Sequence, residues 1–194
     1  MASRLSVVAL ASLLVACYAG PESGKSAATP DPEPFIAART AYRAQAALVD
    51  KSGSPVGTAF FFEERQGVRV DLSVSGLTEG DHGVHVHAVG KCEGPAFTTA
   101  GGHVNPAGRK HGLLVAEGPH AGDLGNVAVD ERGVGRATFF SPHLSTGPGN
   151  PNSVLLGGGL AIVVHAGPDD GRTDPSGNSG DRVLCGVIKG MPVG

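Results

Sequence analysis

The sequence predicts an all-β domain, built as a sandwich or a barrel. Its apolar runs are short and are separated by Gly, Asp and Asn, and its 31 glycines and 14 prolines indicate many turns. Aromatic residues make up only 5% of the chain and Trp is absent, a composition that suits short strands better than a helix bundle. At 194 residues with 40% apolar content, the chain is long enough for one domain with a core of its own.

The first 16 residues are predicted to be an export signal and not part of the fold. Arg4 precedes the apolar run 5–16, which is too short to span a bilayer but has the length of a signal-peptide core. The run ends in LVAC, residues 14–17, which resembles the bacterial lipobox, where the Cys is lipidated and becomes the mature N-terminus. The alternative is an ordinary leader with an incidental Cys.

Lipid on Cys17 would anchor the protein to a membrane without spanning it. We therefore expect an exported lipoprotein of the cell envelope, in the periplasm or at the surface. Tyr18 is not the Asp associated with inner-membrane retention, which favours the outer membrane. Residues 17–40 are predicted to be a flexible tether with a reach on the order of 25 Å, ahead of a domain at 41–194.

Three cysteines leave an odd one in an exported protein unless one of them has another use. Assigning Cys17 to lipid leaves Cys92 and Cys185 as a pair, which an oxidising compartment would allow to form a disulfide. Two buried free thiols are the alternative.

Eight strands are predicted along the domain, with no long helix and no internal repeat. The first, 41–49, is ambiguous because its alanines favour helix, but polar Arg43 and Gln45 alternate with apolar residues up to a turn signal after Val49. A Phe-rich strand follows at 57–63. The next, 68–75, has the clearest period of two in the chain, with Val or Leu at each even position and polar residues between them.

The remaining strands surround a long loop rich in Gly and Pro. In 83–89 the valines face the core and the histidines face the opposite side of the sheet. Strands 126–130 and 134–140 read as a hairpin. The apolar strand 160–165 ends in His165, and 182–188 is the last strand.

Six of the eight histidines lie between residues 81 and 123. His85 and His87 are two positions apart in a strand, so both imidazoles leave the same face and can point at one ion. Further His residues and one Asp follow in the loop: His103, His111, His120 and Asp123. Nitrogen and carboxylate ligands without a thiolate suit zinc or copper.

Several motifs occur in order along the domain, and together they resemble the bacterial copper-zinc superoxide dismutases over residues 41–188. They are HGVHVH at 82–87, AGGHVNP at 100–106, RKHG at 109–112, HAGDLGN at 120–126, VVH at 163–165 and GNSGDRVLCG at 177–186. The resemblance implies an antiparallel Greek-key β-barrel of eight strands with long metal-binding and active-site loops. It also implies a homodimer as a candidate assembly, and an exposed apolar patch around 60–62 is a candidate contact.

The resemblance assigns the metal ligands residue by residue. The implied copper ligands are His85, His87, His103 and His165, and the implied zinc ligands are His103, His111, His120 and Asp123. His103 would bridge the two metals through its two ring nitrogens.

The resemblance also assigns supporting residues. His82 is expected to hydrogen-bond backbone without binding metal, and Asp169 to link His85 with His111 outside the metal shells. The pair of Cys92 and Cys185 matches the family's disulfide.

The implied reaction converts two superoxide anions and two protons to O2 and hydrogen peroxide by cycling copper between Cu(II) and Cu(I). Zinc cannot do this, because it has no accessible redox change. Arg182 would guide the anionic substrate. His103 would release copper and take up a proton in the reduced state, while zinc holds its ring.

Other functions are less consistent with the sequence. A formal net charge of −3 without basic clusters is unsuited to nucleic-acid binding. A module that only stores copper and zinc would need the ligands but not Arg182. A structural sandwich leaves the ligand spacing unexplained, and a zinc hydrolase needs an open zinc position that four protein ligands do not leave.

The sequence also departs from the family pattern. Asp181 precedes Arg182 where relatives often carry Ala or Ser, and is expected to weaken the local positive field. Gly159 stands where many relatives have Arg, and the segment 148–153 looks lengthened. His143 matches nothing in the metal pattern and is predicted to be an exposed loop residue.

Overall fold

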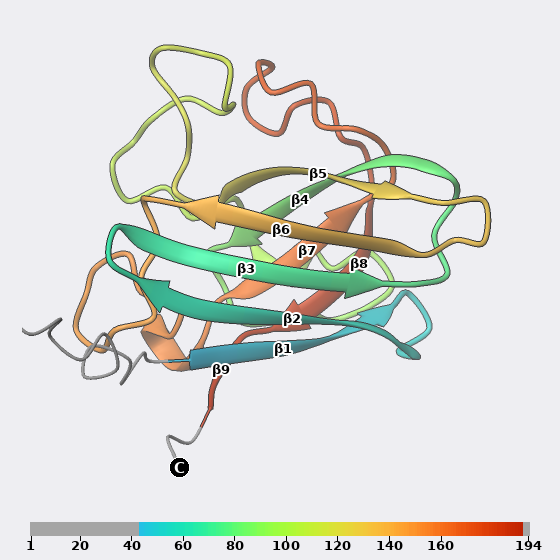
Figure 1. The fold of residues 1–194 in the computed structure, drawn as a ribbon, viewed down its shortest axis with the longest axis horizontal. Coiled ribbons are helices and arrows are strands. Elements are labelled where there is room, and N and C mark those ends of the chain that lie inside the picture. The colour runs from blue at the N-terminus through green and yellow to red at the C-terminus, as the bar shows by residue number, and fades with distance from the viewer. Residues whose placement is uncertain (1–42, 192–194) are drawn as a thin grey trace, which may run out of the picture. The chain divides into compact units, whose positions relative to one another are not determined.

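Residues 43–191 are described in a computed structural model of the chain, and they form a closed antiparallel β-barrel (Figure 1). The predicted signal peptide, Cys17 and the predicted tether lie outside the described residues. The strands are β1 Arg43–Asp50, β2 Pro55–Glu64, β3 Gly67–Val74, β4 Gly80–His87, β5 Asp123–Val129, β6 Gly135–Ser141, β7 Ala161–His165, β8 Arg182–Val187 and the two-residue β9 Lys189–Gly190.

The prediction of eight strands is confirmed, with β9 as a short addition. The ambiguous first segment is a strand, because Ala44, Ala46 and Leu48 are buried while the residues between them face outward. The described helices are two three-residue 3-10 turns, Thr98–Ala100 and Leu156–Gly158. β4 and β5 both begin three residues before their predicted starts, because the two strands pair from Gly80 opposite Val129 to His85 opposite Asp123.

The strands follow the order β2-β3-β6-β5-β4-β7-β8-β1, and the pairing of β1 with β2 closes the ring. Within it, β7 lies beside β4 while β4, β5 and β6 are consecutive neighbours, which is the spatial order of a Greek key. In this ring β3 lies opposite β7, and β2 lies opposite β4. The barrel therefore has two distant outer faces, and Figure 1 shows β2, β3 and β6 in front with β4 and β7 behind.

The core lies inside the barrel and follows from the period of two. In β3, Val68, Val70, Leu72 and Val74 are all buried, as the alternation predicts. The prediction of an exposed apolar patch at 60–62 is wrong for the middle residue, because Phe61 points inward and is fully buried. His143, predicted to be exposed, is half-buried.

Two long loops, one after β4 and one after β7, cover the outer side of those strands. The last six residues of β4 and all five residues of β7 are buried, so both faces of each strand are covered. The loops contact each other, since the Leu114 backbone N–H donates to the Gly171 carbonyl and the His111 N–H donates to Asp174 Oδ1. In Figure 1 the two loops rise together above the barrel.

A disulfide joins Cys92 in the first loop to Cys185 in β8, which confirms the predicted pair. Around it, Phe97, Ala100 and Val163 form a small apolar cluster separate from the main core. The disulfide and this cluster fix the loop to the outside of the barrel.

Replacing both cysteines, Cys92→Ser with Cys185→Ser, is expected to lower the free energy of unfolding of the metal-free protein by roughly 4 to 5 kcal/mol, because the cross-link no longer restricts a long loop of the unfolded chain. Denaturant unfolding of the metal-free oxidised protein and of this variant measures the difference. The reduced wild-type protein is the control and should resemble the variant. A loss below about 1 kcal/mol would show that the loop is held by its other contacts.

Candidate metal centre

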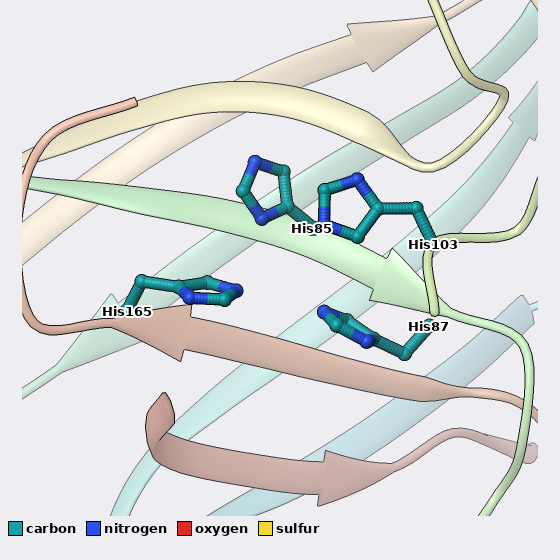
Figure 2. A group of neighbouring side chains, drawn as sticks. All are labelled: His85, His87, His103 and His165. Carbon is teal, nitrogen blue, oxygen red and sulfur yellow. The ribbon is translucent and has the colours of Figure 1, made fainter. Parts of the chain in front are cut away.

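Four histidines meet on the outer side of the barrel, beneath the loops. His85 and His87 come from β4, and His165 ends the neighbouring strand β7. His103 comes from the loop after β4 and is held to that strand by an isolated bridge with His87. Figure 2 shows the four rings around a common space. They share it because His85 and His87 leave the outer face of β4 while Val84 and Val86 fill the core.

The donor atoms form two overlapping groups whose members lie within 4.8 Å of one another. The first contains His85, His87, His103 and His165, which is the set expected for copper. The second contains His85, His103, His111 and Asp123, and differs from the expected zinc set by having His85 in place of His120.

Hydrogen bonds and atom distances resolve this difference. The His85 Nε2–H donates to Asp169 Oδ2 at 2.7 Å, so His85 has only Nδ1 left for one ion. His120 Nδ1 lies 3.3 Å from His103 Nδ1 and 3.4 Å from Asp123 Oδ1. These distances place His120 in the second group in place of His85. We call the first group the copper group, and the second, now His103, His111, His120 and Asp123, the zinc group.

Four buried ring nitrogens have no hydrogen-bond partner within the described structure: His85 Nδ1, His87 Nε2, His111 Nδ1 and His165 Nε2. Buried polar atoms nearly always have a partner, so four unpaired nitrogens on neighbouring rings need an explanation. A lone pair aimed at a metal ion provides it for His85, His87 and His165, whereas His111 Nδ1 lies 3.1 Å from the carboxylate of Asp123, where one ion would be held by both residues. The residues present therefore fit copper and zinc.

In three of the four copper-group rings, the opposite nitrogen is held in place by a hydrogen bond. His87 Nδ1–H donates to the Gly101 carbonyl at 2.9 Å, and His165 Nδ1–H donates to the Gly180 carbonyl at 3.0 Å. His85 is held by Asp169, as described above. Each of these bonds fixes the proton on one nitrogen and leaves a lone pair on the other, which is the form that binds a metal.

Burial keeps these three rings neutral. It lowers the pKa of His85 to about 3, of His87 to about 2 and of His165 to about 4, because a charge there would lose its hydration and neighbouring histidines would repel it. Near neutral pH all three can bind a metal without first losing a proton.

The zinc group is arranged around one oxygen atom of Asp123. Asp123 Oδ1 lies 2.8 Å from His103 Nδ1, 3.1 Å from His111 Nδ1 and 3.4 Å from His120 Nδ1. A tetrahedral ion with metal–ligand bonds of about 2.0 Å has its ligand atoms roughly 3.3 Å apart, so the four donors are spaced for zinc. The other carboxylate oxygen accepts the backbone N–H groups of Gly112 and His120.

Two carboxylates control the charge of His111. Burial opposes a charge on this ring, but the carboxylates of Asp123 and Asp169 outweigh it and raise its pKa to about 9. Burial likewise works against ionising Asp123, yet its histidine partners hold the pKa of that carboxyl well below its usual range. Because a ligand nitrogen must be free of its proton, zinc binding here would release a proton near neutral pH.

Asp169 links the two groups, since its carboxylate accepts from His85 at 2.7 Å and from His111 Nε2 at 3.0 Å. Asn126 on β5 holds the Asp169 backbone from both sides, donating from Nδ2 to its carbonyl and accepting its N–H. Gly177 leaves room for the carboxylate, because a Cβ there would overlap Asp169 and the residue has a φ of +62°.

His82 lies outside both metal groups. It is buried, its Nδ1–H donates to the His165 carbonyl at 2.7 Å, and its Nε2 lies 2.9 Å from the Thr78 carbonyl. It therefore joins β4 to the end of β7, next to a copper-group residue.

Arg182, at the start of β8, is held beside the first group. It pairs with His165 across the β7–β8 ladder. Its guanidinium donates to the Phe97 carbonyl at 2.8 Å and to the Gly101 carbonyl at 2.6 Å. The Gly101 carbonyl also accepts from His87, so one backbone group positions both the cation and a ring of the copper group.

Several supporting groups had no role in the sequence prediction: the carbonyls of Phe97, Gly101 and Gly180, the side chains of Asn126 and Asp174, and Gly177, whose missing side chain makes room for the Asp169 carboxylate. Three of them are backbone carbonyls, which every residue has, so no residue type indicates them. The Gly, Pro and Asp residues around Asp174 and Gly177 indicate tight turns, but they do not show which groups the turns would hold.

Among the described residues, no helix is long and apolar enough to cross a membrane.

Comparison with known proteins gives consistent matches. The family model described as copper/zinc superoxide dismutase matches residues 56–188. The chain is 43% identical over 148 residues to "Superoxide dismutase [Cu-Zn] 2" of Aquifex aeolicus, covering 76% of this chain and 86% of the relative. It is 42% identical over 139 residues to "Superoxide dismutase [Cu-Zn]" of Caulobacter vibrioides, covering 71% and 80%.

Among solved structures, the fold is similar to that of a SOD-like protein from Bacillus subtilis. The TM-score is 0.70 at 34% sequence identity, covering 74% of this chain and 96% of that one. A double mutant of the same protein gives a TM-score of 0.72 at 36% identity, covering 75% and 96%.

Proposed function

The chain belongs to the copper/zinc superoxide dismutase family and is an enzyme of that activity, and we propose that its two donor groups hold the metals as the site geometry suggests. Copper would be held by His85, His87, His103 and His165, and zinc by His103, His111, His120 and Asp123. The observation that supports this assignment most is the set of three unpaired buried nitrogens on the neighbouring rings of His85, His87 and His165.

When bound, copper supplies a one-electron redox couple that oxidises one superoxide to O2 and reduces the next to hydrogen peroxide with two protons, whereas zinc has no accessible redox change. The chain's part is to shape the site. Backbone carbonyls and Asp169 fix the protonated nitrogens of three rings, so their lone pairs need no rearrangement.

His103 is the residue common to both groups. Its Nδ1 faces Asp123 at 2.8 Å, which leaves Nε2 for the copper group. Burial lowers the pKa of the metal-free His103 ring, while Asp123 works in the opposite direction. We assign to Nε2 the proton that is taken up and given back in each cycle.

Arg182 would hold the substrate anion. Its guanidinium carries a permanent charge and is anchored by two carbonyls, so it adds an attractive group at a fixed place beside His165. This arrangement favours turnover over storage of metal, because a storage site gains nothing from a positioned cation.

One purified sample tests the proposal. Metal analysis should give about one copper and one zinc per chain, and the same sample should remove superoxide. A sample replete with both metals but inactive would leave the storage module as the function.

Asp181 is expected to limit the rate. Its carboxylate is 83% exposed next to Arg182 and lies 3.7 Å from Lys51 Nζ. Because an exposed ion pair is largely screened, Lys51 offsets it only partly. Asp181→Ser should therefore raise the second-order rate constant by about two- to fivefold at low ionic strength, with less gain in salt.

Pulse radiolysis over a range of ionic strengths measures this rate. Glu131→Ser, the same charge change in the β5–β6 turn, is the control and should leave the rate unaltered. An unchanged or slower Asp181→Ser enzyme would show that this carboxylate does not oppose the substrate.

We also propose that Cys17 carries lipid and that the protein is held at the outer membrane, after an export signal at 1–16 and a tether at 17–40. The LVAC tetrapeptide supports this proposal. Mass spectrometry of the membrane fraction should find lipid on Cys17, and a soluble product cleaved elsewhere would contradict it. A homodimer stays a prediction, which sedimentation of the purified chain can test.

A further inference from the structure

The exposed phenylalanines gather on one side of the barrel. Six Phe residues lie in the described part of the chain, and Phe61, Phe97 and Phe139 are buried. The other three, Phe60 and Phe62 on β2 and Phe140 on β6, all face outward. Phe60 is 37% exposed and Phe140 is 49% exposed.

Strand register places these three rings on one surface, which we call the aromatic face: Phe60, Phe62, Arg69 and Phe140. Phe62 pairs with Arg69, and Arg69 pairs with Phe140, so the three form one row across β2, β3 and β6. The rings of Phe60 and Phe62 stack with centroids 6.5 Å apart. Residues directly opposite on neighbouring strands share a face, so the row is continuous.

The charges on the aromatic face are balanced. The Arg69 guanidinium lies over the Phe62 ring, 4.3 Å from its centroid, and pairs with Glu64 and with Asp71. Arg136 lies on the same side of β6 as Phe140 and is exposed. Because the positive and negative side chains of the aromatic face balance, this face would not attract a strongly charged partner.

The aromatic face is turned away from the metal centre. Its strands are β2, β3 and β6, whereas the copper-group histidines lie on the outer side of β4 and β7, across the ring of strands. A partner bound at the aromatic face would therefore not cover the side of the barrel on which β4 and β7 lie (Figure 1).

The chain enters the barrel at the edge of this face. Arg43, the first residue of β1, pairs with Phe62. Cys17 precedes Arg43 by 26 positions, and a coil of that length has a root-mean-square reach of about 25 to 30 Å. A lipid on Cys17 would therefore keep a bilayer within reach of the aromatic face at high effective concentration.

We propose that the aromatic face lies against the lipid surface to which Cys17 is anchored. Phenylalanine rings enter the boundary between headgroups and acyl chains favourably, and a tethered domain needs only a weak second contact to be oriented. The metal centre then faces the aqueous phase, from which an anionic substrate arrives. A second copy of the chain fits less well, because three partly exposed rings fall far short of the roughly 800 Å² per partner of a stable interface.

This inference rests on the lipid anchor and not on the dismutase activity, so it is tested without measuring activity. Full-length lipidated protein is placed in vesicles of phosphatidylethanolamine and phosphatidylglycerol that contain brominated acyl chains. A fluorophore is attached either at Arg136→Cys, on the side of the aromatic face, or at Arg172→Cys, on the loop after β7. Quenching by the brominated lipid reports contact with the bilayer.

We expect at least about twofold quenching at position 136 and almost none at position 172. Phe60→Ser with Phe140→Ser should abolish the quenching while the protein still sediments with the vesicles. Leu156→Ser, which removes a 40% exposed leucine elsewhere, is the matched control and should keep it. Phe60→Trp with Phe140→Trp should preserve or strengthen the quenching, which guards against a folding defect in the serine variant.

Vesicle-bound protein with equal quenching at both positions would overturn the inference and leave the anchor intact. Dimers in detergent that Phe60→Ser with Phe140→Ser dissociates would assign the aromatic face to a second copy instead. A chain without lipid on Cys17 would overturn both the anchor and this inference, while superoxide removal by the same sample would stand.

Discussion

His85→Ala is expected to abolish superoxide removal and to strip the protein of copper while most of its zinc remains. The ring supplies one of the unpaired buried nitrogens and is also the partner of Asp169. Losing a partner outside the metal shell already costs about 10- to 100-fold, so loss of a ligand should cost more than about 100-fold in activity. All four zinc donors, His103, His111, His120 and Asp123, remain in this variant and keep their contacts with one another.

Metal analysis and a superoxide assay on the same preparation measure this result. His143→Ala is the matched control, because His143 lies outside both donor groups and should alter neither value. A His85→Ala protein with full copper and undiminished activity would show that the copper site is built from other residues.

Arg182→Glu is expected to slow the reaction by about 100- to 1000-fold without a matching loss of copper, because a local positive charge is what attracts and holds an anion beside the metal. Arg182 contributes no atom to either donor group, so copper content should stay close to that of the wild type. The reversed charge should also reverse the effect of salt, making the variant faster as ionic strength rises.

Two further substitutions separate the substrate role from a structural one. Arg182→Lys keeps the charge but not the paired bonds to Phe97 and Gly101, and should lose less activity than Arg182→Glu. Arg136→Glu makes the same charge reversal on the opposite side of the barrel and should have little effect. Equal loss of copper and activity in Arg182→Glu would mean that the residue acts by supporting His87 through Gly101.

The strands were predictable because their signal is local. Alternation of apolar and polar residues identifies β3 within eight residues, and the same rule assigns the ambiguous β1. The starts of β4 and β5 were less predictable, because Gly80 and Asp123 become strand residues only by pairing with each other's strand. Register is a property of two segments, and one segment cannot specify it.

The residues of the site could be predicted from the sequence, but the arrangement of their donor atoms could not. The resemblance predicted every donor, and the fold brings them together from β4, β7, the loop after β4 and the first residue of β5, Asp123. Distance alone would have assigned His85 to both metals. The hydrogen bond from His85 to Asp169 was needed to show that only one of its nitrogens is free.

By itself, the sequence determined the all-β class, the order of the strands along the chain and the identity of the chemically able side chains, because periodicity and donor atoms are properties of neighbouring residues. Only the tertiary structure decided which nitrogen of each ring is free, that Gly101 holds both His87 and Arg182, and that three phenylalanines share a face opposite the metal centre. These features depend on backbone carbonyls, register and closure of the barrel, which join residues far apart in the chain.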